Sequence, residues 1–155
     1  RSHGRGQRLT SPGLVFLAAT FSIFWSVGCG NDRGLVPVSG TVTFQGAEMP
    51  ASGTMTFLPT GPTEGHPTRP AVGLFQQNGK YSARTFEPKD GLYPGEYAVT
   101  LECWKVPPTI QGPPAQSFID PIYGSPQSSK LSVSVKSGDR SVTYDFDVGP
   151  PGASR

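Results

Sequence analysis

The sequence predicts an all-β protein, an antiparallel β-sandwich of about seven strands preceded by a cleaved signal segment. The first observation is that apolar and polar residues alternate with a period of two in several short segments. The second is that glycine (20) and proline (17) make up about a quarter of the 155 residues, which is typical of a chain with many turns. The third is that no segment after residue 28 shows a convincing helical periodicity.

Length and charge limit the classes of protein to which the chain can belong. A chain of 155 residues has room for one domain with a substantial core. Its formal charge of +2 comes from its first residues, because Arg1, Arg5 and Arg8 precede an apolar run and the remainder carries 10 basic and 11 acidic residues. The sequence has no cluster of Lys and Arg interleaved with aromatic residues, so we expect no nucleic-acid-binding face.

Residues 1–28 are predicted to be a lipoprotein signal peptide. The apolar run over residues 14–27 is shorter than the ~20 residues that span a bilayer comfortably. It ends at Ser26-Val27-Gly28-Cys29, which resembles the bacterial lipobox, although Ser26 stands where the lipobox usually has Leu. The resemblance implies cleavage before Cys29 and acylation of that residue, which would anchor the protein to a membrane. The alternative is an ordinary secretory signal with an incidental cysteine.

The body of the chain is expected to follow a short tether over residues 29–37. Four alternating segments come next and are predicted strands: residues 38–44, 54–58, 71–76 and 81–85. Residues 59–70 hold four prolines and two glycines, which predicts a loop. Asn78-Gly79 predicts a hairpin turn, because both residues tolerate positive φ. Phe75 and Phe86 fall on nominal outer faces, where they would form a second apolar patch.

The longest clean alternation covers residues 94–105 and predicts the central strand. Its inward face is apolar and consists of Tyr97, Val99, Leu101 and Cys103. Cys103 is therefore expected to be a small buried thiol. Trp104 falls on the other face beside the following loop, where it either covers the base of that loop or contacts a partner.

The last third of the chain begins with its least regular part. Residues 106–129 contain six prolines and are predicted to be a proline-rich loop, which at this length is either functional or mobile. Two alternating segments, 130–135 and 141–148, predict a closing hairpin. A flexible tail is expected over residues 149–155.

Three groups of residues carry a resemblance to a known family: Val38-Ser39-Gly40-Thr41-Val42-Thr43, Asn78-Gly79-Lys80-Tyr81 and Pro94-Gly95-Glu96-Tyr97-Ala98-Val99. They resemble the transthyretin-like, carboxypeptidase-regulatory-like β-sandwich, particularly the small lipoproteins of planctomycete-type bacteria. The resemblance covers residues 29–148 and implies a prealbumin-like Greek-key sandwich. Those lipoproteins also tend to have a proline-rich insertion and a Pro-x-x-Tyr segment, to which Pro121-Ile122-Tyr123 corresponds here with one residue fewer between proline and tyrosine. Because the motifs are mostly turns, they predict a fold and not an activity.

Few residues offer enzyme chemistry. His3 lies in the leader, and His66 lies in the loop over residues 59–70, where a solvated side chain is more common than a catalytic base or a metal ligand. No Cys/His cluster has the spacing of a zinc site. The transthyretin relatives that hydrolyse 5-hydroxyisourate use several histidines, and the mature chain has only His66. We therefore expect no catalytic residue and no cofactor.

Three carboxylates near the end of the chain leave one metal alternative open. Asp145 and Asp147 alternate on the outer face of the last predicted strand, and Asp139 lies in the preceding turn. They could form part of a calcium site, since calcium requires several hard oxygen ligands. Carboxylates on an exposed strand more often keep that face solvated, so our expectation is that the chain holds no metal.

These observations predict a non-enzymatic lipoprotein that is exported to the cell envelope, anchored to a membrane by lipid on Cys29, and faces the periplasm or the exterior. Its sandwich would bind an envelope protein or a polysaccharide, with Trp104 and Tyr123 as candidate partner contacts. The alternative is a small-ligand carrier or a hydrolase built on the same sandwich. A third possibility is a purely structural spacer.

Overall fold

The computed structural model describes residues 33–62 and 65–153, and within them the protein is all-β. The predicted signal peptide over residues 1–28 and the predicted lipidation site Cys29 lie outside the described residues. No helix in the described ranges is long and apolar enough to span a membrane.

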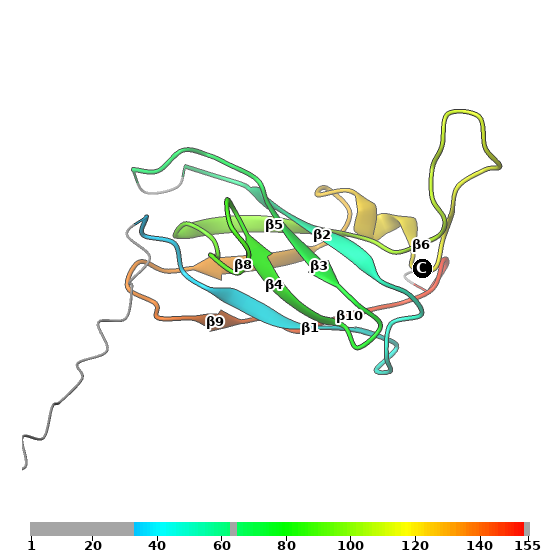
Figure 1. The fold of residues 1–155 in the computed structure, drawn as a ribbon, viewed down its shortest axis with the longest axis horizontal. Helices are drawn as coiled ribbons and strands as arrows, with labels where there is room; N and C mark the ends of the chain where they lie inside the picture. The colour runs from blue at the N-terminus through cyan, green and yellow to red at the C-terminus, as the bar shows by residue number, and fades with distance from the viewer. Residues whose placement is uncertain (1–32, 63–64, 154–155) are drawn as a thin grey trace, which may run out of the picture.

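Eight strands form one sheet, and a two-stranded ribbon and a short 3₁₀ helix stand apart from it (Figure 1). The elements are β1 (Val38–Phe44), β2 (Gly53–Pro59), β3 (Ala71–Phe75), β4 (Lys80–Arg84), β5 (Gly95–Glu102), β6 (Trp104–Val106), β7 (Gln116–Ser117), η1 (Pro121–Gly124), β8 (Leu131–Val135), β9 (Val142–Thr143) and β10 (Phe146–Val148). The strand order is β10-β1-β4-β3-β2-β5-β8, with β9 also paired to β1. This single sheet curves nearly into a barrel, so the all-β prediction is confirmed, whereas two separate sheets are not.

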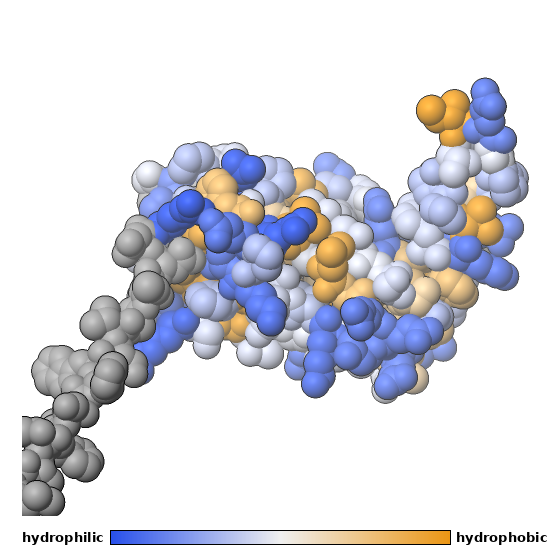
Figure 2. All heavy atoms as spheres, in the orientation of Figure 1, coloured by the Kyte–Doolittle hydropathy of each residue, from blue (hydrophilic) through white to orange (hydrophobic). Residues whose placement is uncertain are grey.

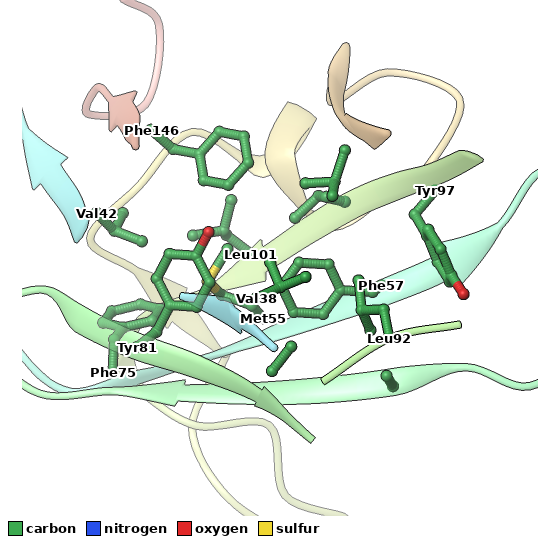
Figure 3. Packing of buried hydrophobic residues seen from close by; sticks show 14 of the residues in the cluster. Val38, Val42, Met55, Phe57, Phe75, Tyr81, Leu92, Tyr97, Leu101 and Phe146 are labelled. Atoms are coloured by element: carbon green, nitrogen blue, oxygen red, sulfur yellow. The ribbon is translucent and has the colours of Figure 1, made fainter. Parts of the chain in front are cut away.

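The core follows the predicted alternation along β5. Tyr97, Val99, Leu101 and Cys103 are all buried, which confirms the predicted inward face. Figure 3 shows Tyr97 and Leu101 among the core side chains. The regular strand ends at Glu102, and the chain turns away after Cys103 into β6.

The expected outward position of Phe75 is wrong. Its side chain is 1% exposed and lies in the same core as Tyr81 and Val42 (Figure 3). β3 has apolar residues on both faces, and pairing with β2 and β4 turns Phe75 inward while Leu74 is left 62% exposed. Phe86 is 39% exposed, so only one of the two phenylalanines lies at the surface.

The predicted closing hairpin is also corrected. β9 and β10 both run parallel to β1 and pair with it, while β8 pairs with β5. β1 has one edge occupied by β4, and its other edge offers backbone N–H and C=O groups that must find partners. The segment over 141–148 supplies those partners through its two short strands, β9 and β10. It makes no backbone ladder with β8.

Tyr144 closes the seam, by which we mean the gap between β8 and the β9–β10 segment. Its hydroxyl donates to the carbonyl of Ser134 at 2.7 Å and accepts from the Ser134 amide at 3.1 Å. The carbonyl of Tyr144 accepts from the hydroxyl of Tyr81 at 2.7 Å. A side chain at Gly40 would collide with that carbonyl, so β1 needs glycine at this close approach. The sheet is thus closed by side chains where its backbone ladder is interrupted.

The domain extends beyond both predicted boundaries. Leu35 and Val36 are 6% and 4% exposed, and Val36 exchanges backbone hydrogen bonds with Leu92 at 2.8 and 2.9 Å, so the end of the predicted tether is part of the fold. At the other terminus the Gly152 amide donates to Asp120 Oδ2 at 2.8 Å. The first residues of the predicted tail are therefore held against the body.

Candidate functional site

The candidate site is a groove at the base of the arm, which we define as residues 104–117. The arm consists of β6, β7 and the turn between them, and it projects from one end of the sheet (Figure 1). The groove has a volume of about 360 Å³. Its lining comes from the end of β5, both sides of the arm and η1: Leu101, Glu102, Trp104, Ala115, Ser117, Ile119, Asp120, Pro121, Gly124 and Ser125.

Trp104 forms one wall of the groove. Its backbone pairs with Ser117 across the ribbon, and its indole Nε1 donates to Glu102 Oε2 at 3.2 Å. The side chain is half-buried at the base of the arm, a position compatible with both alternatives that the sequence left open for it. Glu102 itself is exposed, so the pair presents an oriented indole and a carboxylate on the same side of the groove.

Asp120 holds the opposite wall in place, and sequence reasoning missed it. Its Oδ1 accepts from the Ile122 amide at 3.1 Å, which caps η1, and Pro121 occupies the first position of that helix. Its own amide donates to the carbonyl of Gly149 at 2.9 Å, which ties η1 to the end of the chain. The signal was present as the dipeptide Asp120-Pro121, since aspartate before proline is a common helix start.

Ser117 and Cys103 connect the groove to the core. Ser117 Oγ donates to the Cys103 carbonyl at 3.2 Å and accepts from the Ile119 amide at 3.1 Å. The Cys103 thiol is fully buried and donates to the Ala51 carbonyl at 3.6 Å. Burial raises the pKa of this thiol, so it stays protonated at neutral pH and is a packing group rather than a nucleophile.

Tyr123 does not line the groove. It belongs to η1, its amide donates to the Asp120 carbonyl at 3.1 Å, and its side chain packs against the core. The structure therefore brings Trp104 and the η1 backbone together but places the Tyr123 side chain elsewhere. The predicted loop over residues 106–129 is correspondingly more ordered than expected, because it contains β7 and η1.

The rest of the arm is open to solvent. Residues 107–116 are all exposed, and Ile110 is fully so. Figure 2 shows the arm as a projection from the body with hydrophobic atoms near its tip. The groove thus lies where a projecting ribbon meets the sheet.

The three carboxylates considered for calcium have separate structural partners. Asp145 Oδ1 accepts from the Thr41 amide at 2.7 Å, and Asp147 Oδ1 accepts from Thr43 Oγ1 at 2.7 Å and the Gly46 amide at 2.8 Å. Asp139 Oδ2 accepts from the Lys136 amide at 3.0 Å. Within residues 33–62 and 65–153, no group of three or more His, Cys, Asp or Glu side chains is placed to hold a metal ion.

His66 packs at the opposite end of the sheet, which we call the entry end because Arg33–Pro37 joins the fold there. Its ring stacks on Tyr93 with centroids 4.2 Å apart, and Tyr93 meets the edge of Phe86. The guanidinium groups of Arg33 and Arg69 lie 5.0 and 4.6 Å from the Phe86 ring centroid. His66 is therefore a member of an aromatic cluster and not the freely solvated side chain that the sequence suggested.

Comparison with known proteins adds no relative to this description. No family model matches the sequence. No curated protein is significantly similar to it. The functional conclusion consequently depends on the geometry of the chain and on its sequence motifs.

Proposed function

We propose that the protein is a membrane-anchored envelope lipoprotein that recognises an envelope component through the groove beside Trp104. The observation that carries this proposal is that the chain enters the domain at one end and the arm projects from the other (Figure 1), with the groove at the base of the arm. β1 alone runs for seven residues between these ends, which corresponds to about 20 Å. An anchor on Cys29 would hold the entry end at the membrane and leave the groove facing outward.

The family resemblance is also part of this proposal. The three motif segments become β1, the turn between β3 and β4, and the start of β5, and Gly79 in that turn has φ of +70°. These positions support a transthyretin-like β-sandwich as the narrower description of the fold. Such a scaffold holds loops at both of its ends, an arrangement that suits a recognition module. The scaffold does not indicate any particular chemistry.

A small-ligand carrier is the second candidate function, and one observation favours it. The groove volume of about 360 Å³ falls within the range of small-molecule sites, roughly 300–1,000 Å³. A carrier would release its ligand elsewhere, whereas a recognition module would keep the domain attached to a fixed envelope structure.

The anchor is tested on the full chain expressed in a bacterial host. Mass spectrometry of the mature N-terminus should find Cys29 acylated, and Cys29→Ser should move the protein from the membrane fraction to the soluble envelope fraction. A mature N-terminus at another residue, or membrane retention of the serine variant, would contradict the anchor.

Recognition is tested by photo-crosslinking in the intact envelope. A photoreactive residue placed at Ala115, which lines the groove, should form a discrete high-mass adduct. The matched control carries the same residue at Leu74, which is exposed on the outer face of β3 far along the chain from the arm. Equal adducts from both positions, or none from Ala115, would contradict a groove-specific partner and favour a structural spacer.

A further inference from the structure

We infer that the groove beside Trp104 binds a short stretch of a neutral or amine-bearing glycan, an assignment that rests on the proposed recognition function. A protein partner needs about 800 Å² of matching surface on each side, whereas a groove of about 360 Å³ has the size of a small-ligand site. A few sugar rings of a longer chain match that size.

The indole of Trp104 offers a ligand an apolar surface. Its only ring donor, Nε1, is already used on Glu102, so a ligand meets the apolar surface of the ring rather than a free N–H. An indole face carries negative electrostatic character and attracts the C–H edges of a flat ligand. A pyranose ring offers such C–H groups on one face and hydroxyls around its rim. The hydrogen bond to Glu102 also orients the indole before the ligand arrives, which lowers the entropy cost of binding.

The charged side chains that line the groove are all acidic. The groove residues include two carboxylates, Glu102 and Asp120, and no lysine or arginine. Carboxylates accept hydrogen bonds from hydroxyl and ammonium groups, whereas they repel acidic ligands. No cationic side chain lines the groove to offset that repulsion. The exposed Glu102 carboxylate and the Ser125 hydroxyl, which donates to Gln127 Oε1 at 2.7 Å, lie where a ligand's polar rim would pass. The lining therefore selects neutral or amine-bearing sugars over acidic ones.

The walls of the groove are held in place by hydrogen bonds. Asp120 is 7% exposed, and its two carboxylate oxygens accept from the amides of Ile122 and Gly152. Ser117 is held between the Cys103 carbonyl and the Ile119 amide. Both walls are therefore fixed to the body by hydrogen bonds, although the arm above them is exposed. Such a pre-organised groove lowers the entropy cost of binding. It therefore suits a ligand that makes weak contacts and repeats along a chain.

The test is a calorimetric titration of the full chain, purified in a detergent without a sugar headgroup. The probes are chitotriose, its deacetylated triamine and trigalacturonic acid, which share a length of three rings and differ in charge. Chitotriose or the triamine should bind at least tenfold more tightly than the acidic trimer. Preferred binding of the acidic trimer, or no heat from any of the three up to millimolar concentration, would overturn the inference.

Variants assign that binding to the groove. Trp104→Ala should weaken it at least tenfold, while Trp104→Phe, which keeps an aromatic face, should retain most of it. Glu102→Gln should reduce binding of the triamine more than binding of chitotriose, because only the triamine gains from the charge. Ile110→Ala at the exposed arm tip is the matched control and should bind as the parent does. Unchanged binding by Trp104→Ala would overturn the inference.

These results separate the inference from the proposed function. If Ala115 forms a specific adduct with an envelope protein and no trisaccharide binds, then recognition stands and the glycan assignment fails. If a trisaccharide binds but Cys29 carries no lipid, then the glycan site stands and the anchor fails.

Discussion

The entry end and the arm are built in opposite ways. At the entry end, Leu35 and Val36 are buried, and Val36 is bridged to Leu92, which lies more than fifty residues further along the chain. The arm is held by a two-pair ladder between neighbouring segments, and the residues between its strands are all exposed. The entry end is part of the hydrophobic core, and the arm is an exposed extension of the domain.

This difference predicts that substitutions at the two ends have unequal effects on stability. Burying apolar side chains stabilises the folded state roughly in proportion to the area removed from water, so substitutions at the entry end act on the whole domain. Exposed arm residues contribute little of that free energy, so they can vary without unfolding the sheet. The groove lies at the boundary of the two, where walls held by hydrogen bonds meet an exposed projection.

The largest difference in stability is expected when one apolar side chain is truncated at each end. Leu92→Ala removes a fully buried side chain and should lower the free energy of unfolding by about 2–5 kcal/mol. Ile110→Ala removes a fully exposed side chain and should change it by no more than about 0.5 kcal/mol. Urea denaturation followed by circular dichroism measures both. Similar losses for the two variants would mean that the arm belongs to the cooperative core.

A smaller effect is expected at Tyr97, whose hydroxyl donates to the Tyr93 carbonyl at 2.8 Å near the entry end. Tyr97→Phe removes that hydrogen bond and should cost about 1 kcal/mol at neutral pH. Burial raises the pKa of Tyr97 to about 12, and the neighbouring Tyr93 adds to the rise.

The raised pKa of Tyr97 also predicts a pH dependence. An unfolded tyrosine releases its proton near pH 10, whereas folded Tyr97 keeps it until about pH 12. Stability is therefore fully present below pH 10 and falls as pH rises from 10 to 12, because only the unfolded state releases this proton there. Tyr97→Phe should make that fall shallower without abolishing it, since burial also raises the pKa of Tyr81. An equally steep loss in the variant, measured by denaturation at pH 8 to 11.5, would contradict this assignment.

The smallest effect is expected from shortening the arm. Replacing residues 108–114 with Asn-Gly should preserve the pairing of β6 with β7 and change the free energy of unfolding by no more than about 0.5 kcal/mol. Thermal denaturation of the shortened chain beside the parent measures it. A large loss would show that the exposed arm supports the sheet, and the distinction between the two ends would then not hold.

Sequence patterns predicted faces well where one face was clearly apolar. Along β5 the alternation placed Tyr97 and Cys103 inward, and both are buried. Along β3 both faces carry apolar residues, and the pattern alone assigned Phe75 to the wrong one. A period of two fixes which residues share a face, and only packing against neighbouring strands decides which face is inside.

Strand pairing and the groove required tertiary information. The segment over 141–148 was correctly predicted as extended, yet it pairs with β1, about a hundred residues earlier, and leaves Tyr144 to reach β8. The groove likewise joins Trp104 with Asp120. Asp120-Pro121 is a local signal for a helix start, but no local pattern brings that helix start beside Trp104.

The sequence by itself determined the all-β class, the position of most strands, the Asn78-Gly79 turn and the buried face of β5. These features depend on dihedral preferences and on an alternation that extend over a few neighbouring residues. Only the tertiary structure decided the partner of each strand edge, the closure of the sheet by Tyr144 and the placement of the groove opposite the entry end. Those features depend on which distant groups satisfy one another's hydrogen bonds and fill one core, and that competition is resolved only when the whole chain is folded.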